Sequence, residues 1–184
     1  MTPRHTLPLL CTLALLAACR SDPIAFHTLT PVHAPTQASS NAAEVVIEGI
    51  SVPPQVDRAQ IVIRQGSNGL AILETEWWGA SLSEELRSAL VVQLGNGSAA
   101  HKVAVKINVQ RFDSIPGQYA LIDARWRLRG AEGGEMLNCH SLLQTPAGPE
   151  IEDLVRAQQN NVQGLATQIR QAAGNLRGGC PGNG

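Results

Sequence analysis

The chain has few aromatic residues, few lysines and no long hydrophobic run. Aromatic side chains make up 3% of its 184 residues, and Lys102 and Lys106 are its only lysines. The formal net charge is −1, so there is no strong electric field that recruits nucleic acid or an anionic surface. The longest apolar run, within residues 7–18, is far shorter than the roughly twenty residues that a membrane-spanning helix needs. These scarcities argue against a nucleic-acid-binding protein and against a helical membrane protein.

Motifs for catalysis and metal binding are also missing. The sequence contains no G-x-S-x-G motif, no phosphate-binding loop and no glycine-rich dinucleotide fingerprint. Cys139 and His140 are adjacent, but neighbours on a strand point to opposite faces of the sheet, so they do not form a ligand pair. We therefore expect no catalytic residues, no bound metal and no dissociable cofactor.

The N-terminus has the composition of a secretory signal. A short basic start with Arg4 precedes the apolar run, and small residues follow it. The segment Leu16-Ala17-Ala18-Cys19 resembles the bacterial lipobox. That resemblance implies cleavage before Cys19 and acylation of its thiol, which makes residues 1–18 a lipoprotein signal peptide. The alternative is an ordinary signal peptide with a chance cysteine.

Cleavage before Cys19 leaves a mature chain long enough for one domain with a substantial core. Residues 19–43 are expected to hold the lipidated N-terminus, a short strand and a tether rich in Pro, Ala, Ser and Thr, and residues 44–184 the main domain. Arg20 occupies the position where enteric-type lipoproteins retained at the inner membrane carry Asp. The resemblance therefore implies the periplasmic face of the outer membrane.

Two of the four cysteines remain after the N-terminus is accounted for. Cys11 leaves with the signal peptide and Cys19 carries lipid, which leaves Cys139 and Cys180. In an oxidising compartment such a pair commonly forms a disulfide, and two free buried thiols are the alternative. A helix ending shortly before Cys180 is expected to bring it close to the face toward which Cys139 points.

Hydrophobic periodicity predicts a mixed fold, α/β in the α+β sense. Alternating apolar residues indicate several strands, and apolar residues every three or four positions indicate two amphipathic helices. Ser81 and Glu84 form a capping-box pattern at the start of the first helix. The strand–helix–strand order around it suggests a βαβ crossover. We expect a single domain with a mixed, largely antiparallel sheet packed by two main helices. The expected strands are 26–30, 44–52, 60–64, 70–77, 102–112, 119–129 and 135–145, and the expected helices are 81–94 and 149–176.

Two surface features are candidates for partner binding. Arg125, Arg127 and Arg129 alternate along one strand and share a face, where they could meet lipid headgroups or an acidic partner. The alternative is a solvated face balanced by cross-strand carboxylates. Trp77 and Trp78 cannot share a face of an extended chain, so one is expected in the core and the other exposed or bound to a partner.

The segment Val46 to Arg64, together with the lipobox, resembles the PqiC-like ABC-type transport auxiliary lipoproteins, and the likeness covers nearly the whole mature chain. Similar segments are "FHTLTP" at 26–31, "WWGASL" at 77–82, "RFD" at 111–113 and "LIDARWRL" at 121–128. Asp57 is suited to start a turn, and Arg58 could clamp a backbone carbonyl or a carboxylate; the alternative is a purely structural turn. Ala59 departs from the proline usual in the family. The residues matching the central motif are Pro53, Val56, Asp57, Arg58, Gln60, Ile61 and Val62.

The resemblance implies a non-catalytic subunit of an envelope lipid-transport system. Its partners would be a periplasm-spanning protein with MCE (mammalian cell entry) domains and that protein's inner-membrane permease or related integral protein. The chain would dock the lipid conduit to the outer membrane, and it could self-associate into a ring. The competing classes are a lipoprotein of another envelope assembly, for secretion or lipopolysaccharide export, and a lipid-anchored periplasmic enzyme.

Overall fold

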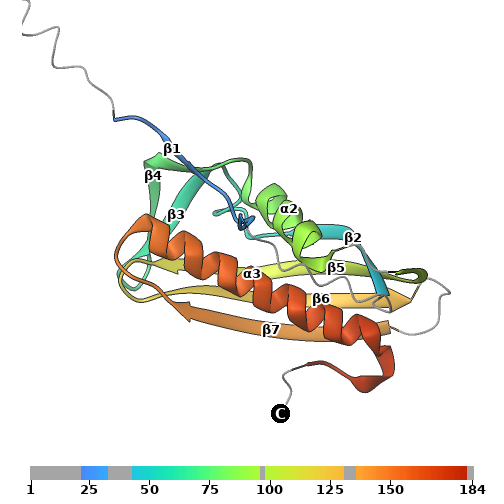
Figure 1. The fold of residues 1–184 in the computed structure, drawn as a ribbon. Helices are drawn as coiled ribbons and strands as arrows, with labels where there is room; N and C mark the ends of the chain where they lie inside the picture. The colour runs from blue at the N-terminus through green and yellow to red at the C-terminus, as the bar shows by residue number, and fades with distance from the viewer. Residues whose placement is uncertain (1–21, 33–42, 96–97, 131–135, 182–184) are drawn as a thin grey trace, which may run out of the picture.

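The computed structural model describes residues 22–32, 43–95, 98–130 and 136–181. The signal peptide, Cys19 and most of the tether lie outside these residues. The described chain forms two β-sheets and two α-helices (Figure 1). These elements share one continuous hydrophobic core. In chain order the elements are β1 (Ala25–His27), β2 (Ala43–Ser51), β3 (Gln60–Gln65), β4 (Gly69–Trp78), α2 (Leu82–Leu94), β5 (Ser98–Ile115), β6 (Tyr119–Gly130), β7 (Met136–Pro146), α3 (Ile151–Gly174) and the short 3₁₀ helix η1 (Leu176–Gly178).

The structure confirms the predicted mixed class and the single domain, and it divides the strands between two sheets. A three-stranded sheet has the order β1-β4-β3, and a four-stranded sheet has the order β2-β5-β6-β7. The predicted βαβ crossover is wrong, because the strands flanking α2 belong to different sheets. Both edges of β4 are already occupied by β1 and β3, so β5 cannot pair with it. The parallel pairs are instead β1 with β4 and β2 with β5.

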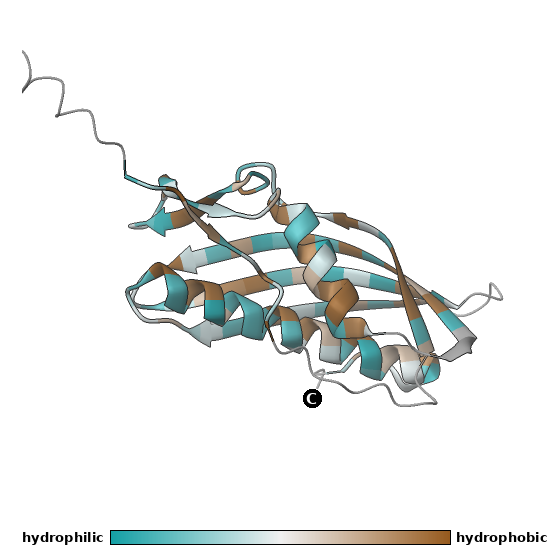
Figure 2. Ribbon diagram, turned by 45° about the horizontal axis from the view of Figure 1, so that its top comes forward, coloured by the Kyte–Doolittle hydropathy of each residue, from teal (hydrophilic) through white to brown (hydrophobic). Residues whose placement is uncertain are grey.

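The four-stranded sheet is covered by helices on one face. Alternate residues of β6, including Ile122, Ala124, Trp126 and Leu128, are buried on that face, and α3 packs against β6 and β7. Figure 2 shows the alternation of hydrophobic and hydrophilic residues along these strands, with the two helices lying across them. Because strand side chains alternate between faces, the intervening arginines are left on the opposite, helix-free face.

Both helices form where the periodicity predicts them. The leucine stripe of α2 is buried, and Gly95 ends that helix with φ of 68°, a conformation that glycine adopts without steric cost. The capping box is wrong in detail: the Ser81 side chain makes no cap hydrogen bond to the helix backbone and contacts the Glu84 carboxylate instead. The buried residues of α3 are Leu154, Val155, Ala157, Gln158, Asn161, Val162, Leu165, Ala166, Ile169, Ala172 and Ala173.

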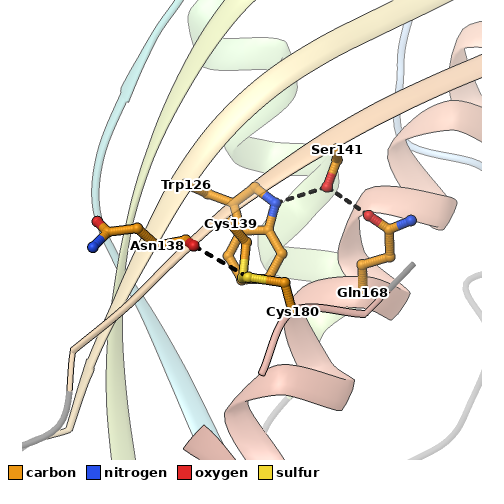
Figure 3. The surroundings of a disulfide bond; sticks show 6 residues. All are labelled: Trp126, Asn138, Cys139, Ser141, Gln168 and Cys180. Atoms are coloured by element: carbon orange, nitrogen blue, oxygen red, sulfur yellow. Dashed lines mark hydrogen bonds between the residues drawn. A yellow bond between two sulfur atoms is a disulfide. The ribbon is translucent and has the colours of Figure 1, made fainter. Parts of the chain in front are cut away.

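The C-terminal segment is fixed to β7 by the predicted disulfide. Cys139 and Cys180 are bonded, with their Cα atoms 5.5 Å apart (Figure 3). Beside the bridge, the Trp126 indole N–H donates to Ser141 Oγ at 2.7 Å, and the Ser141 hydroxyl donates to Gln168 Oε1 at 2.5 Å. This chain of hydrogen bonds joins β6, β7 and α3, so the covalent and polar links stabilise the same end of the sheet.

Candidate functional site

The helix-free face of the four-stranded sheet contains a basic hollow of about 590 Å³. Two cross-strand rows of side chains line it. One row holds Lys106, Arg127 and Asn138, and the other holds Asn108, Arg125 and His140. Cys139 and Cys180 also border the hollow, at the edge strand β7. The structure therefore brings Arg125 and Arg127 together, as predicted, in a concave surface that joins three strands.

The basic side chains on this face differ in the partners that the structure shows. Arg129 pairs with Glu48 on β2, as expected for a balanced face. Arg125 instead donates to the neutral Gln110 side chain at 3.1 Å. Among the residues that the structure describes, neither Lys106 nor Arg127 has a carboxylate within ion-pair distance.

The acidic group on the same face is already engaged. Asp123 lies opposite Arg111 in the β5–β6 register, and its Oδ1 is 2.8 Å from His140 Nε2. Lys106 and His140 were not predicted to belong to this surface. Their outward-facing positions can be read from the alternation along β5 and β7, the two strands that flank β6. The register that aligns them with Arg125 and Arg127 depends on tertiary pairing, so it cannot be read from the alternation alone.

The "RFD" segment joins the two sheets. Phe112 packs edge-to-face on Trp78, with ring centroids 6.5 Å apart. The buried Asp113 carboxylate accepts from Arg64 Nε of β3 at 2.6 Å and from Arg111 at 2.6 Å. The hydrogen bond with the Asp113 carboxylate raises the pKa of the Arg111 guanidinium above its usual value. This motif is therefore structural, and it fixes the three-stranded sheet against β5.

The residues of the central motif do not converge on the basic hollow. Asp57 Oδ1 accepts from the backbone N–H of Ser83 at 3.1 Å, which caps the start of α2 from a distant loop. Gln60 begins β3 and pairs with Trp77. Within the described residues the buried Arg58 Nε has no hydrogen-bond partner, and the clamp suggested by the sequence is not seen there. The positions of Asp57 and Gln60 favour a structural role for the motif.

Replacing Asp57 by Ala is expected to lower the free energy of unfolding by about 1 kcal/mol, because a helix loses its cap. Urea unfolding of the mature chain measures the change. Asp57→Asn keeps a side-chain oxygen acceptor and should restore most of the loss. Equal destabilisation by Ala and Asn is the result that contradicts the capping role.

The tryptophan pair divides as predicted. Trp78 is buried in the core against Phe112. Trp77 is half-buried and lies edge-to-face on Phe26 of β1, with ring centroids 6.3 Å apart. Its indole N–H donates to the Glu74 carbonyl oxygen at 3.0 Å. Trp77 is therefore on a different surface from the basic hollow.

Within its described residues the chain shows no group of three or more His, Cys, Asp or Glu side chains that could hold a metal ion. In the same residues, no helix is both long and apolar enough to cross a membrane. The described part of the molecule is thus a mixed α/β domain whose distinctive surface is an open basic sheet face.

The comparisons with known proteins agree with this class. The family model for the ABC-type transport auxiliary lipoprotein component matches residues 27–170, and the chain belongs to that family. By this description, members of the family are lipoproteins that serve as auxiliary components of ABC-type transport. No curated protein matches the sequence.

Two solved structures share the fold at low sequence identity. One, described as an uncharacterized protein, is 14% identical, with a TM-score of 0.67 over 82% of this chain and 98% of that one. The other, a Xanthomonas campestris protein of the DUF330 family, is 15% identical, with a TM-score of 0.65 over 81% of this chain and 95% of that one. These likenesses support the architecture described above.

Proposed function

We propose that the chain is a non-catalytic outer-membrane lipoprotein of an MCE-type lipid-transport system, tethered through Cys19 on the periplasmic face. In this role it docks an MCE-domain protein, which spans the periplasm from its inner-membrane permease, and so aligns the lipid conduit with the outer membrane. The family membership supports a transport accessory.

The observation that carries the docking role is the basic hollow. Lys106 and Arg127 lie next to each other across β5 and β6, and both are exposed. Neither has a carboxylate partner among the described residues. Because like charges placed side by side repel, an acidic surface of a partner relieves this repulsion when it binds. The docking face of the MCE-domain protein is therefore expected to be acidic.

Charge reversal in the hollow tests the proposal. The variant Lys106→Glu/Arg127→Glu should recover at least about tenfold less MCE-domain protein, since an affinity loss of about 1.4 kcal/mol already gives that factor. The measurement is quantitative co-purification of the tagged, full-length chain from detergent-solubilised envelopes. Wild-type recovery should also fall as salt is raised, because the contact is electrostatic.

Arg156→Glu is the matched control. Arg156 is an exposed arginine on α3, on the helix-covered side of the sheet, and its partner Asp153 is on its own helix. This variant should bind as the wild type does. Equal recovery by wild type and the double variant contradicts docking through the hollow, and consistent recovery of a different envelope assembly contradicts the MCE assignment.

A further inference from the structure

A small apolar surface lies where the chain leaves the domain toward Cys19. Ile24 is 45% exposed and Phe26 is 68% exposed, and Phe26 packs on the half-buried Trp77. We call Ile24, Phe26 and Trp77 the tether patch. The chain has only six aromatic residues. Trp78, Phe112 and Trp126 are buried, and two of the other three, Phe26 and Trp77, lie at this surface.

The tether patch is held rigidly on the body of the domain. Phe26 is in parallel register with Trp77, and His27 contacts the Glu76 carboxylate. Just beyond, the buried Glu85 of α2 accepts from the Thr28 hydroxyl at 2.8 Å and from the Leu29 N–H at 2.9 Å.

Two further contacts lock the same segment. The Leu29 side chain is fully buried in the core. Gln159 of α3 donates to the Thr28 carbonyl oxygen at 2.9 Å. The direction in which the chain departs at β1 is thus fixed by the fold (Figure 1). A lipid anchor upstream of β1 would therefore hold the domain to the membrane by the β1 edge of the three-stranded sheet.

The length of chain to Cys19 limits what can cover the patch. Ile24 follows Cys19 by five positions, a span of at most about 18 Å when fully extended. If the Cys19 acyl chains are in the bilayer, Ile24 is always near the membrane surface. Tryptophan and other aromatic side chains are favoured at that interface. Moving exposed apolar side chains from water into the headgroup region lowers the free energy.

We propose that the tether patch is a second membrane contact, which inserts into the periplasmic leaflet and sets the orientation of the domain on it. This inference rests on the lipidation of Cys19 in the proposed function. The basic hollow is on the other sheet, so membrane contact at β1 and β4 leaves it free for an acidic partner.

Quenching of tryptophan fluorescence tests the contact. The lipidated full-length chain is reconstituted into vesicles of phosphatidylethanolamine and phosphatidylglycerol containing a phospholipid brominated in the upper part of its acyl chains. We expect part of the wild-type emission to be quenched and Trp77→Phe to lose that quenched component. Trp78 and Trp126 are buried, so they are shielded from the bromine.

The variant Ile24→Ser/Phe26→Ser should reduce the quenching, because it removes apolar area but keeps the fluorophore. Leu142→Ser is the matched control and should leave quenching unchanged. Leu142 is 59% exposed but lies on β7, in the sheet that does not contain β1.

Flotation of the vesicles separates the two ways of failing. A wild-type chain that does not float with the vesicles lacks its acyl anchor, and then both the proposed tether and the membrane contact fall. A chain that floats but shows no Trp77-dependent quenching keeps the tether and overturns the membrane contact alone.

Discussion

Cys19→Ser is expected to abolish acylation and to remove the chain from the outer-membrane fraction. Serine has no thiolate to accept the diacylglycerol group. Two or more acyl chains give a stable anchor, so without them the chain should lose its stable retention there, which the tether patch alone does not replace. Labelling with radioactive palmitate, combined with fractionation of envelopes on a density gradient, measures both effects.

Cys11→Ser is the control for this experiment. Cys11 is also a cysteine near the N-terminus, but it lies within the predicted signal peptide and should be removed with it. That variant should incorporate label and fractionate with the outer membrane as the wild type does. Undiminished label in Cys19→Ser contradicts the tether, and label lost only in Cys11→Ser places the acylated residue elsewhere.

Loss of the Cys139–Cys180 bridge is expected to lower the free energy of unfolding by about 4 kcal/mol. The two cysteines are 41 residues apart, and a crosslink that closes a loop of this length restricts the unfolded chain by roughly that amount. Cys180→Ala removes the bridge and leaves Cys139 as a small buried thiol. Urea unfolding followed by tryptophan fluorescence reports the change, since Trp126 lies opposite Cys139.

Two comparisons check that the bridge itself is responsible. Reduction of the wild type should reproduce the loss, whereas Pro181→Ala, next to Cys180, should leave stability unchanged. A difference below about 1 kcal/mol between oxidised and reduced wild type contradicts a stabilising disulfide.

Local patterns predicted the elements of this fold well. The long helix was expected over 149–176 and is found as α3, because its apolar stripe has the helical period and acidic residues occupy its first turn. The alternation in β6 by itself separates the buried Trp126 from the exposed Arg125 and Arg127. Periodicity is a local property, so it is readable from one sequence.

Contacts between segments far apart in the sequence could not be predicted from these local patterns. The three-residue strand β1 occupies one edge of β4, and this divides the strands into two sheets. The Arg129–Glu48 ion pair joins residues 81 positions apart. Asp57 caps a helix that begins 25 positions later, while the adjacent Ser81 does not. Such contacts depend on the packed arrangement of the whole chain, and no local propensity encodes them.

Site-specific photo-crosslinking from the basic hollow tests the central claim most directly. A photoreactive amino acid in place of Arg127, in the lipidated chain in living cells, lies within reach of whatever occupies the hollow. We predict a crosslinked product in the outer-membrane fraction that contains an MCE-domain protein. Crosslinks formed only to components of another envelope assembly, or none from the hollow while control positions on α3 react, contradict the account.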